Sequence, residues 1–153
     1  LDANKIIKMV LLHDLARGYA GDITPYEPLI WKNDETDLTS MYERWVRIPQ
    51  KEKERFAKES EKKEHDAFHK LLRYLPSSAT QELETIWEEY HNRITKEARF
   101  VYQLHTMENF LQALEYWKED KNFPIESWWH QMKESISEPV FMKLLQQLDM
   151  HFH

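Results

Sequence analysis

Glycine is almost absent from this chain, and that shortage constrains the fold more than any other feature. Only two of the 153 residues are glycine and six are proline, so the chain lacks the turn residues that a sheet with many hairpins requires. Residues that favour helices, such as glutamate, lysine, leucine and glutamine, are abundant instead. We therefore predict an all-α fold.

Apolar residues recur at helical spacing along most of the chain. We expect Asp2 or Asn4 to cap the first helix, Gly18 to end it, and Ser78 and Thr95 to cap two later helices. Residues 26–48 break the pattern and read as an irregular insertion in a single domain spanning 1–153. The predicted helices are 3–17, 49–74, 80–93, 96–119, 126–136 and 139–152.

Composition and charge exclude several classes of function. The formal net charge of −6 argues against nonspecific binding to nucleic acid or to an anionic membrane. No apolar run approaches the roughly 18 residues of a membrane span. The chain has no cysteine, which rules out disulfides and zinc–thiolate sites and fits a reducing compartment, so we expect a cytoplasmic protein.

Both glycines lie in the segment "LLHDLARGYAGDITP", just after the adjacent pair His13 and Asp14. A neutral imidazole and a carboxylate together suit a divalent metal ion, and a glycine turn lets the backbone approach a ligand closely. The alternative is an ordinary helix C-terminus, where histidine is favoured by the helix dipole. A second pair, His65 and Asp66, lies in a charged run without a glycine turn and reads as solvated surface.

The same segment resembles the metal-binding motif of the HD-domain phosphohydrolases, and in particular that of their 5'-deoxynucleotidase branch. The resemblance continues over about residues 3–118, which implies the all-α HD-domain helical bundle. The segments that carry it further along the chain are "IPQKEKERFAKESEKKE", "LETIWEEY" and "TKEARFVYQLHTMENFLQALEYW".

The resemblance implies a set of site residues. The family holds a divalent ion (manganese, cobalt, iron, zinc or magnesium) with a histidine, then the His-Asp pair, then a late aspartate. His13 and Asp14 match the pair, and His105 stands at the late aspartate. We expect the helix that carries the first histidine to precede Leu1. Asp22 matches the aspartate after the glycine turn and would be catalytic, orienting the water or the leaving group.

Two of these positions depart from the family pattern. The family's acid–base glutamate falls on Arg17, whose guanidinium cannot take a proton and would repel a cation. Arg17 could instead contact a phosphate, or simply pair with a nearby acid such as Asp14. His105 could be a ligand or a hydrogen-bonded buried histidine, and Asp22 could be a turn residue.

Two functions therefore stay open. The first is a metal-dependent 5'-deoxynucleotidase that hydrolyses deoxynucleoside 5'-monophosphates, with activity impaired by the loss of the acid–base residue. The second is a catalytically degenerate HD-domain protein, with its metal lost, that binds a nucleotide, another small phosphorylated ligand or a protein partner. The resemblance also implies a homodimer.

Overall fold

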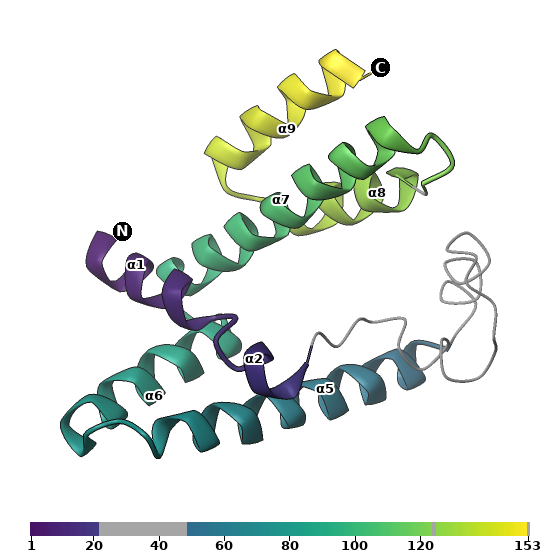
Figure 1. Ribbon diagram of the computed structural model, residues 1–153. Coiled ribbons are helices and arrows are strands. Elements are labelled where there is room, and N and C mark those ends of the chain that lie inside the picture. Colours follow the sequence, from purple (N-terminus) through teal and green to yellow (C-terminus); the bar gives the residue numbers. More distant parts are fainter. Residues whose placement is uncertain (22–48, 124, 153) are drawn as a thin grey trace. The chain divides into compact units, whose positions relative to one another are not determined.

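Helices make up the regular secondary structure of this protein, as a computed structural model shows it (Figure 1). The structure describes residues 1–21, 49–123 and 125–152, and no strand occurs among them, which confirms the all-α prediction. The predicted insertion at 26–48 lies outside these ranges. The helices are α1 (Ala3–Leu12), α2 (Arg17–Ala20), α5 (Gln50–Leu72), α6 (Ser77–Asn92), α7 (Lys96–Glu119), α8 (Ile125–Ser135) and α9 (Pro139–Phe152).

Side-chain caps set the starts of α1 and α7 as predicted. The Asp2 carboxylate accepts hydrogen bonds from the amides of Asn4 and Lys5 at 2.9 and 3.2 Å. The Thr95 hydroxyl accepts one from the Ala98 amide at 3.2 Å. These bonds satisfy amides that a helix leaves unpaired in its first turn.

The start of α6 differs from the prediction. Ser78 lies inside the first turn and does not cap the helix, which begins at Ser77. The Pro76 carbonyl accepts hydrogen bonds from the amides of Ala79 and Thr80 at 3.0 and 3.2 Å, so the first turn closes two residues earlier than a Ser78 cap would allow.

The first predicted helix is wrong in its extent. It was expected to run over 3–17, but α1 ends at Leu12 and α2 begins only at Arg17. Between them the amides of Leu15 and Arg17 bond to the carbonyl three residues back, at 3.1 and 3.0 Å, which is the tighter 3₁₀ pattern. Gly18 lies within α2, and the turn after it ends on Gly21 at φ 81°, a conformation that favours glycine.

The chain divides into two compact units, each described by itself. Unit 1 comprises Leu1–Ile6 and Glu89–His153, and unit 2 comprises Ile7–Glu88. Helices α1 and α6 each contribute residues to both units.

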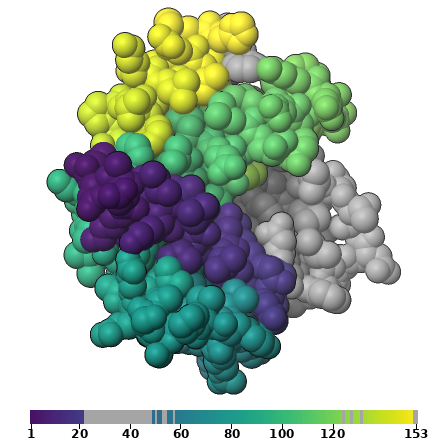
Figure 2. All heavy atoms as spheres, turned by 60° about the vertical axis from the view of Figure 1, so that its left-hand side comes forward, coloured from purple at the N-terminus to yellow at the C-terminus, as the bar shows by residue number. Residues whose placement is uncertain are grey.

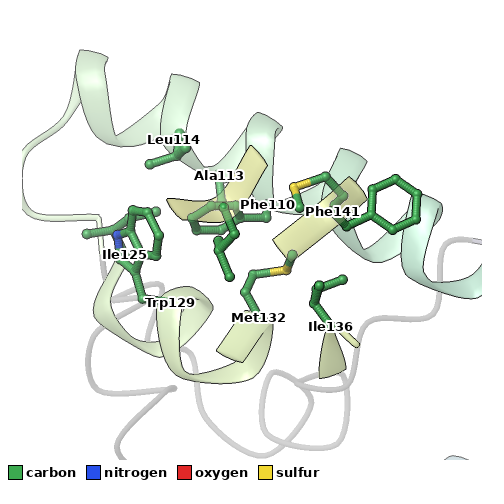
Figure 3. Close-up of a cluster of buried hydrophobic side chains, with 10 residues drawn as sticks. Phe110, Ala113, Leu114, Ile125, Trp129, Met132, Ile136 and Phe141 are labelled. Carbon is green, nitrogen blue, oxygen red and sulfur yellow. The ribbon is translucent and has the colours of Figure 1, made fainter. Parts of the chain in front are cut away.

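Unit 1 is built on α7, against which α8 and α9 pack (Figures 1 and 2). Its core is a cluster of buried apolar side chains from these three helices and from the link between α8 and α9 (Figure 3). In it the ring of Phe110 meets that of Trp129 edge-on with centroids 4.6 Å apart. The cluster consists of Met107, Phe110, Ala113, Leu114, Ile125, Trp129, Met132, Ile136, Phe141 and Leu145.

Two buried polar side chains of α7 fix the chain on either side of this core. Gln103 accepts hydrogen bonds from the amides of Ser137 and Glu138 at 2.8 and 2.9 Å and donates to the Ser137 hydroxyl at 3.1 Å, which secures the start of α9. Glu97 accepts one from the Asp2 amide at 3.0 Å. That bond, opposed by burial, holds the pKa of Glu97 below its ordinary value.

In unit 2, α2 packs against α5, and the two long helices α5 and α6 are joined by a short turn. Phe68 of α5 is fully buried and stacks on Trp87 of α6, with ring planes 8° apart and centroids at 4.5 Å. This contact fixes which faces of α5 and α6 meet.

Candidate metal centre

His13 and Asp14 lie in the turn between α1 and α2, which we call the HD turn (residues 13–16). The helix predicted over 3–17 would include both residues together with Arg17. In the structure α1 ends at Leu12 and α2 begins at Arg17, so His13 and Asp14 lie in the break between the two helices. The His13 side chain is 11% exposed and that of Asp14 44%, so the imidazole is held in place while the carboxylate can meet solvent.

A main-chain carbonyl orients the His13 ring. Nδ1 lies 2.7 Å from the carbonyl oxygen of Val10, and because a carbonyl can only accept, Nδ1 carries the proton. Val10 is also the residue whose carbonyl a continuing helix would offer to the Asp14 amide. The ring therefore ends α1 and, in its neutral form, leaves Nε2 with the lone pair that a metal ion needs.

That nitrogen faces the neighbouring carboxylate. His13 Nε2 lies 3.2 Å from Asp14 Oδ2. Two lone pairs that meet at this distance repel each other unless a proton or a metal ion lies with them. The pair is thus a nitrogen and an oxygen donor set in place for a positive species, which fits a divalent ion.

Arg17 occupies the other side of the same carboxylate. Its Nε lies 3.2 Å from Asp14 Oδ1 and 3.7 Å from Oε1 of Glu64 on α5. The predicted alternative of a pairing with Asp14 is therefore confirmed, whereas contact with a phosphate stays a prediction. The guanidinium partly neutralises the carboxylate that would bind a cation.

Glu64 is the residue at this site that sequence reasoning missed. Its side chain is 18% exposed although it lies in a run of charged residues that reads as solvated surface. The signal was weak, because charge on a long helix does not reveal which acid faces Arg17.

His105 lies on α7 in unit 1, and its side chain is 14% exposed. Asn109 places its amide nitrogen 3.1 Å from Nε2. With the amide donating, the proton of the neutral ring is on Nδ1, on the side of Glu108 Oε2 at 4.0 Å. Nε2 is then the acceptor, and its lone pair is occupied by the Asn109 amide, so an ion would have to displace that hydrogen bond to bind there. Asp22 lies outside the described residues.

Comparison with known protein families places the chain in one of them. The family model described as "HD domain" matches residues 1–147. The chain therefore belongs to the HD-domain family, and the resemblance stated from the sequence is confirmed.

Its relatives carry one name, "5'-deoxynucleotidase HDDC2". The protein of that name from Mus musculus is 29% identical over 150 residues, covering 97% of this chain and 62% of the relative. The Homo sapiens protein is 27% identical over 150 residues, covering 97% and 61%. The Xenopus laevis protein is 33% identical over 116 residues, covering 76% and 45%. The chain thus spans about three fifths of the length of the curated relatives it matches along nearly its whole length.

Proposed function

We propose that this chain is a metal-dependent phosphohydrolase domain that acts on deoxynucleoside 5'-monophosphates at reduced rate. The observation that carries the proposal is the HD turn, in which a main-chain bond presents His13 Nε2 beside the Asp14 carboxylate. Membership of the HD-domain family supports the reaction type. The name of the relatives, 5'-deoxynucleotidase, supports the substrate class.

We assign the ion to His13 Nε2 and Asp14 Oδ2, and the family resemblance implies His105 as the third ligand. Such a set of two imidazoles and one carboxylate suits manganese, cobalt, iron or zinc better than magnesium. When bound, the ion supplies a water of lowered pKa at neutral pH.

The chain's own residues then position the substrate. The Arg17 guanidinium lies beside Asp14 and Glu64. A substrate phosphate could replace these two carboxylates as the partner of the guanidinium. Asp22 would orient the attacking water or the leaving nucleoside. Arg17 cannot transfer a proton, and a missing acid–base group costs about 10²–10⁴ in rate. We therefore expect slow turnover.

One observation favours the second candidate function, a degenerate domain that binds phosphate without metal. Arg17 already pairs with the Asp14 carboxylate and so competes with any cation for it. In that case a phosphorylated ligand would bind to Arg17 and the protein would retain no stoichiometric metal.

Elemental analysis of protein purified without chelator tests the two functions against each other. We expect about one transition-metal ion per chain that His13→Ala removes, together with slow phosphate release from deoxynucleoside 5'-monophosphates on addition of manganese or cobalt. Lys8→Ala, in the same unit, is the matched control because Lys8 pairs with Glu82 and not with the HD turn.

Absence of bound metal, with none taken up on titration, would refute the hydrolase and favour the phosphate-binding function. Manganese disfavours sites made of nitrogen donors alone, so manganese that stays bound in His13→Ala would refute the assigned ligands.

We further propose that both units belong to one HD domain, since the family model spans them. The resemblance implies a homodimer, and the absence of cysteine fits a cytoplasmic location. Sedimentation analysis and cell fractionation test these two proposals. No helix among the described residues combines the length and apolar character needed to cross a membrane.

A further inference from the structure

A second pair of histidines lies on α5, away from the HD turn in sequence. The sequence drew attention to His65 through its neighbour Asp66, but its closer partner is His69, one helical turn further on. The two Nε2 atoms lie 2.9 Å apart, and the ring centroids are 4.2 Å apart. Both rings therefore bring the same nitrogen to one point.

This separation matches two nitrogen ligands of one ion. An imidazole nitrogen binds zinc at about 2.0–2.1 Å, and two such nitrogens at a right angle about one ion are roughly 2.9 Å apart. Right angles between neighbouring ligands are typical of copper(II) and nickel(II), and a modest opening of the pair gives the tetrahedral angle that zinc prefers.

A carboxylate lies on the far side of each ring. His69 Nδ1 is 3.4 Å from Oε1 of Glu84 on α6, and His65 Nδ1 is 3.9 Å from Oδ1 of Asp66. A carboxylate at Nδ1 favours the tautomer with its proton there and its lone pair on Nε2, and it raises the basicity of the ligand nitrogen. The contact between the two Nε2 atoms is itself a hydrogen bond, in which one ring donates a proton and the other accepts it. An ion that replaces this proton would take the lone pairs of both Nε2 atoms, and the Glu84 carboxylate supports that tautomer at His69.

The pair is open to solvent on one side and supported on the other. The side chains of His65 and His69 are 49% and 35% exposed. A hollow of about 430 Å³ lined in part by His69 and Glu84 adjoins them, so water can complete the coordination of an ion. On the inner side the His65 ring lies 5.8 Å from that of Trp87, which is itself buried against Phe68.

We propose that His65 and His69 chelate a divalent transition-metal ion of the copper, nickel or zinc type through their Nε2 atoms. Glu84 acts as a positioning residue through the Nδ1 of His69. The site shares no residue with the HD turn and does not depend on the proposed hydrolase activity. Its nitrogen donors disfavour magnesium and calcium.

Titration calorimetry with nickel chloride on untagged protein tests the proposal. His13→Gln serves as the background, so that the ligand set of the HD turn is incomplete. We expect one nickel ion per chain. His65→Gln and His69→Gln should each weaken binding about tenfold or more, because a single imidazole loses the benefit of two linked donors. Glu84→Gln should weaken it about 10-fold through the second shell.

His130→Gln is the matched control, since His130 is an exposed histidine on α8 with no place in the pair. It should leave the affinity unchanged. Glutamine keeps the helical propensity of α5, and circular dichroism confirms that each variant retains its helices.

A second measurement identifies the donors directly. Copper(II) bound to the His13→Gln protein should give an electron paramagnetic resonance spectrum with coupling to two nitrogens, reduced to one in His65→Gln. Nickel affinities that are equal in His65→Gln, His69→Gln and His130→Gln would overturn the proposal, as would a copper spectrum that the His65 substitution does not alter. If nickel binds the unsubstituted protein but not His13→Gln, the metal belongs to the HD turn, and the proposal is equally overturned.

Discussion

Removing the positive charge of Arg17 should strengthen metal binding at the HD turn, and the structure gives the size of the effect. Arg17 Nε lies 3.2 Å from Asp14 Oδ1, and a carboxylate oxygen lies about 2 Å from an ion it binds. An ion held by Asp14 would therefore lie roughly 6 Å from the guanidinium charge. The Arg17 side chain is 39% exposed, so solvent screens the interaction and a dielectric constant near that of water applies.

Under those conditions a single charge and a divalent ion repel by about 1.4 kcal/mol, which is about tenfold in affinity. Arg17→Gln should thus bind the ion about tenfold more tightly, and Arg17→Glu, which reverses the charge, about 100-fold. Arg17→Glu also restores the residue type that the family resemblance implies at this position, so it should raise the rate of phosphate release as well.

Manganese titration followed by calorimetry measures the affinities, since manganese disfavours the all-nitrogen donors of the His65 and His69 pair. Arg55→Gln is the control for net charge. Arg55 pairs with Glu59 on the same helix and lies about 13 Å along α5 from Glu64, which is beyond the screening length at physiological salt. Equal manganese affinities in the Arg17 and Arg55 variants would refute the reasoning.

Three further predictions concern the stability of unit 1. Gln103→Met should lower the free energy of unfolding in urea by about 1.5–4 kcal/mol because it removes three hydrogen bonds, while exposed Gln112→Ala should change it by less than about 0.5 kcal/mol; equal losses would contradict the role of Gln103. Phe110→Ala, at a fully buried ring, should cost about 3–5 kcal/mol in the same assay, and a loss below 1 kcal/mol would show that the cluster is not tightly packed. The pKa of Glu97 is lower in the folded chain than its ordinary 4.5, so what this carboxylate contributes to the free energy of unfolding is complete above that pH. The contribution is lost as the pH falls through the folded pKa. Glu97→Gln should therefore flatten the fall of stability at acid pH, and an unchanged fall would count against the bond from Asp2.

The long helices could be predicted because their signals are local. α7 runs over the predicted residues 96–119, since the Thr95 cap defines its start and the Asn122–Phe123 turn follows its end. The family resemblance, which depends on residues spread over about 3–118, was likewise available from the sequence.

The end of α1 could not be predicted, because its cause is a bond between a side chain and the main chain. Periodicity continues through Leu15, but in the structure the His13 ring bonds to the Val10 carbonyl that the next helical amide would use. The pairing of Arg17 with Asp14 was open from the sequence as one of two alternatives, because residues three apart lie near each other on a helix. The position of Glu64 depends on how α2 packs on α5, which no local pattern encodes.

The histidine pair on α5 shows the opposite case. The four-residue spacing of His65 and His69 was present in the sequence and places two side chains on one helical face. The sequence analysis grouped His65 with the adjacent Asp66 instead. In the structure Asp66 Oδ1 lies 3.9 Å from His65 Nδ1, whereas His69 Nε2 lies 2.9 Å from His65 Nε2.

The bond between His13 and the Val10 carbonyl has a consequence for the main chain when this ligand is lost. His13→Ala removes the imidazole but frees the carbonyl for the Asp14 amide, so α1 can lengthen by the hydrogen bond that it lacks. The substitution that removes the metal ligand is therefore expected to leave α1 helical.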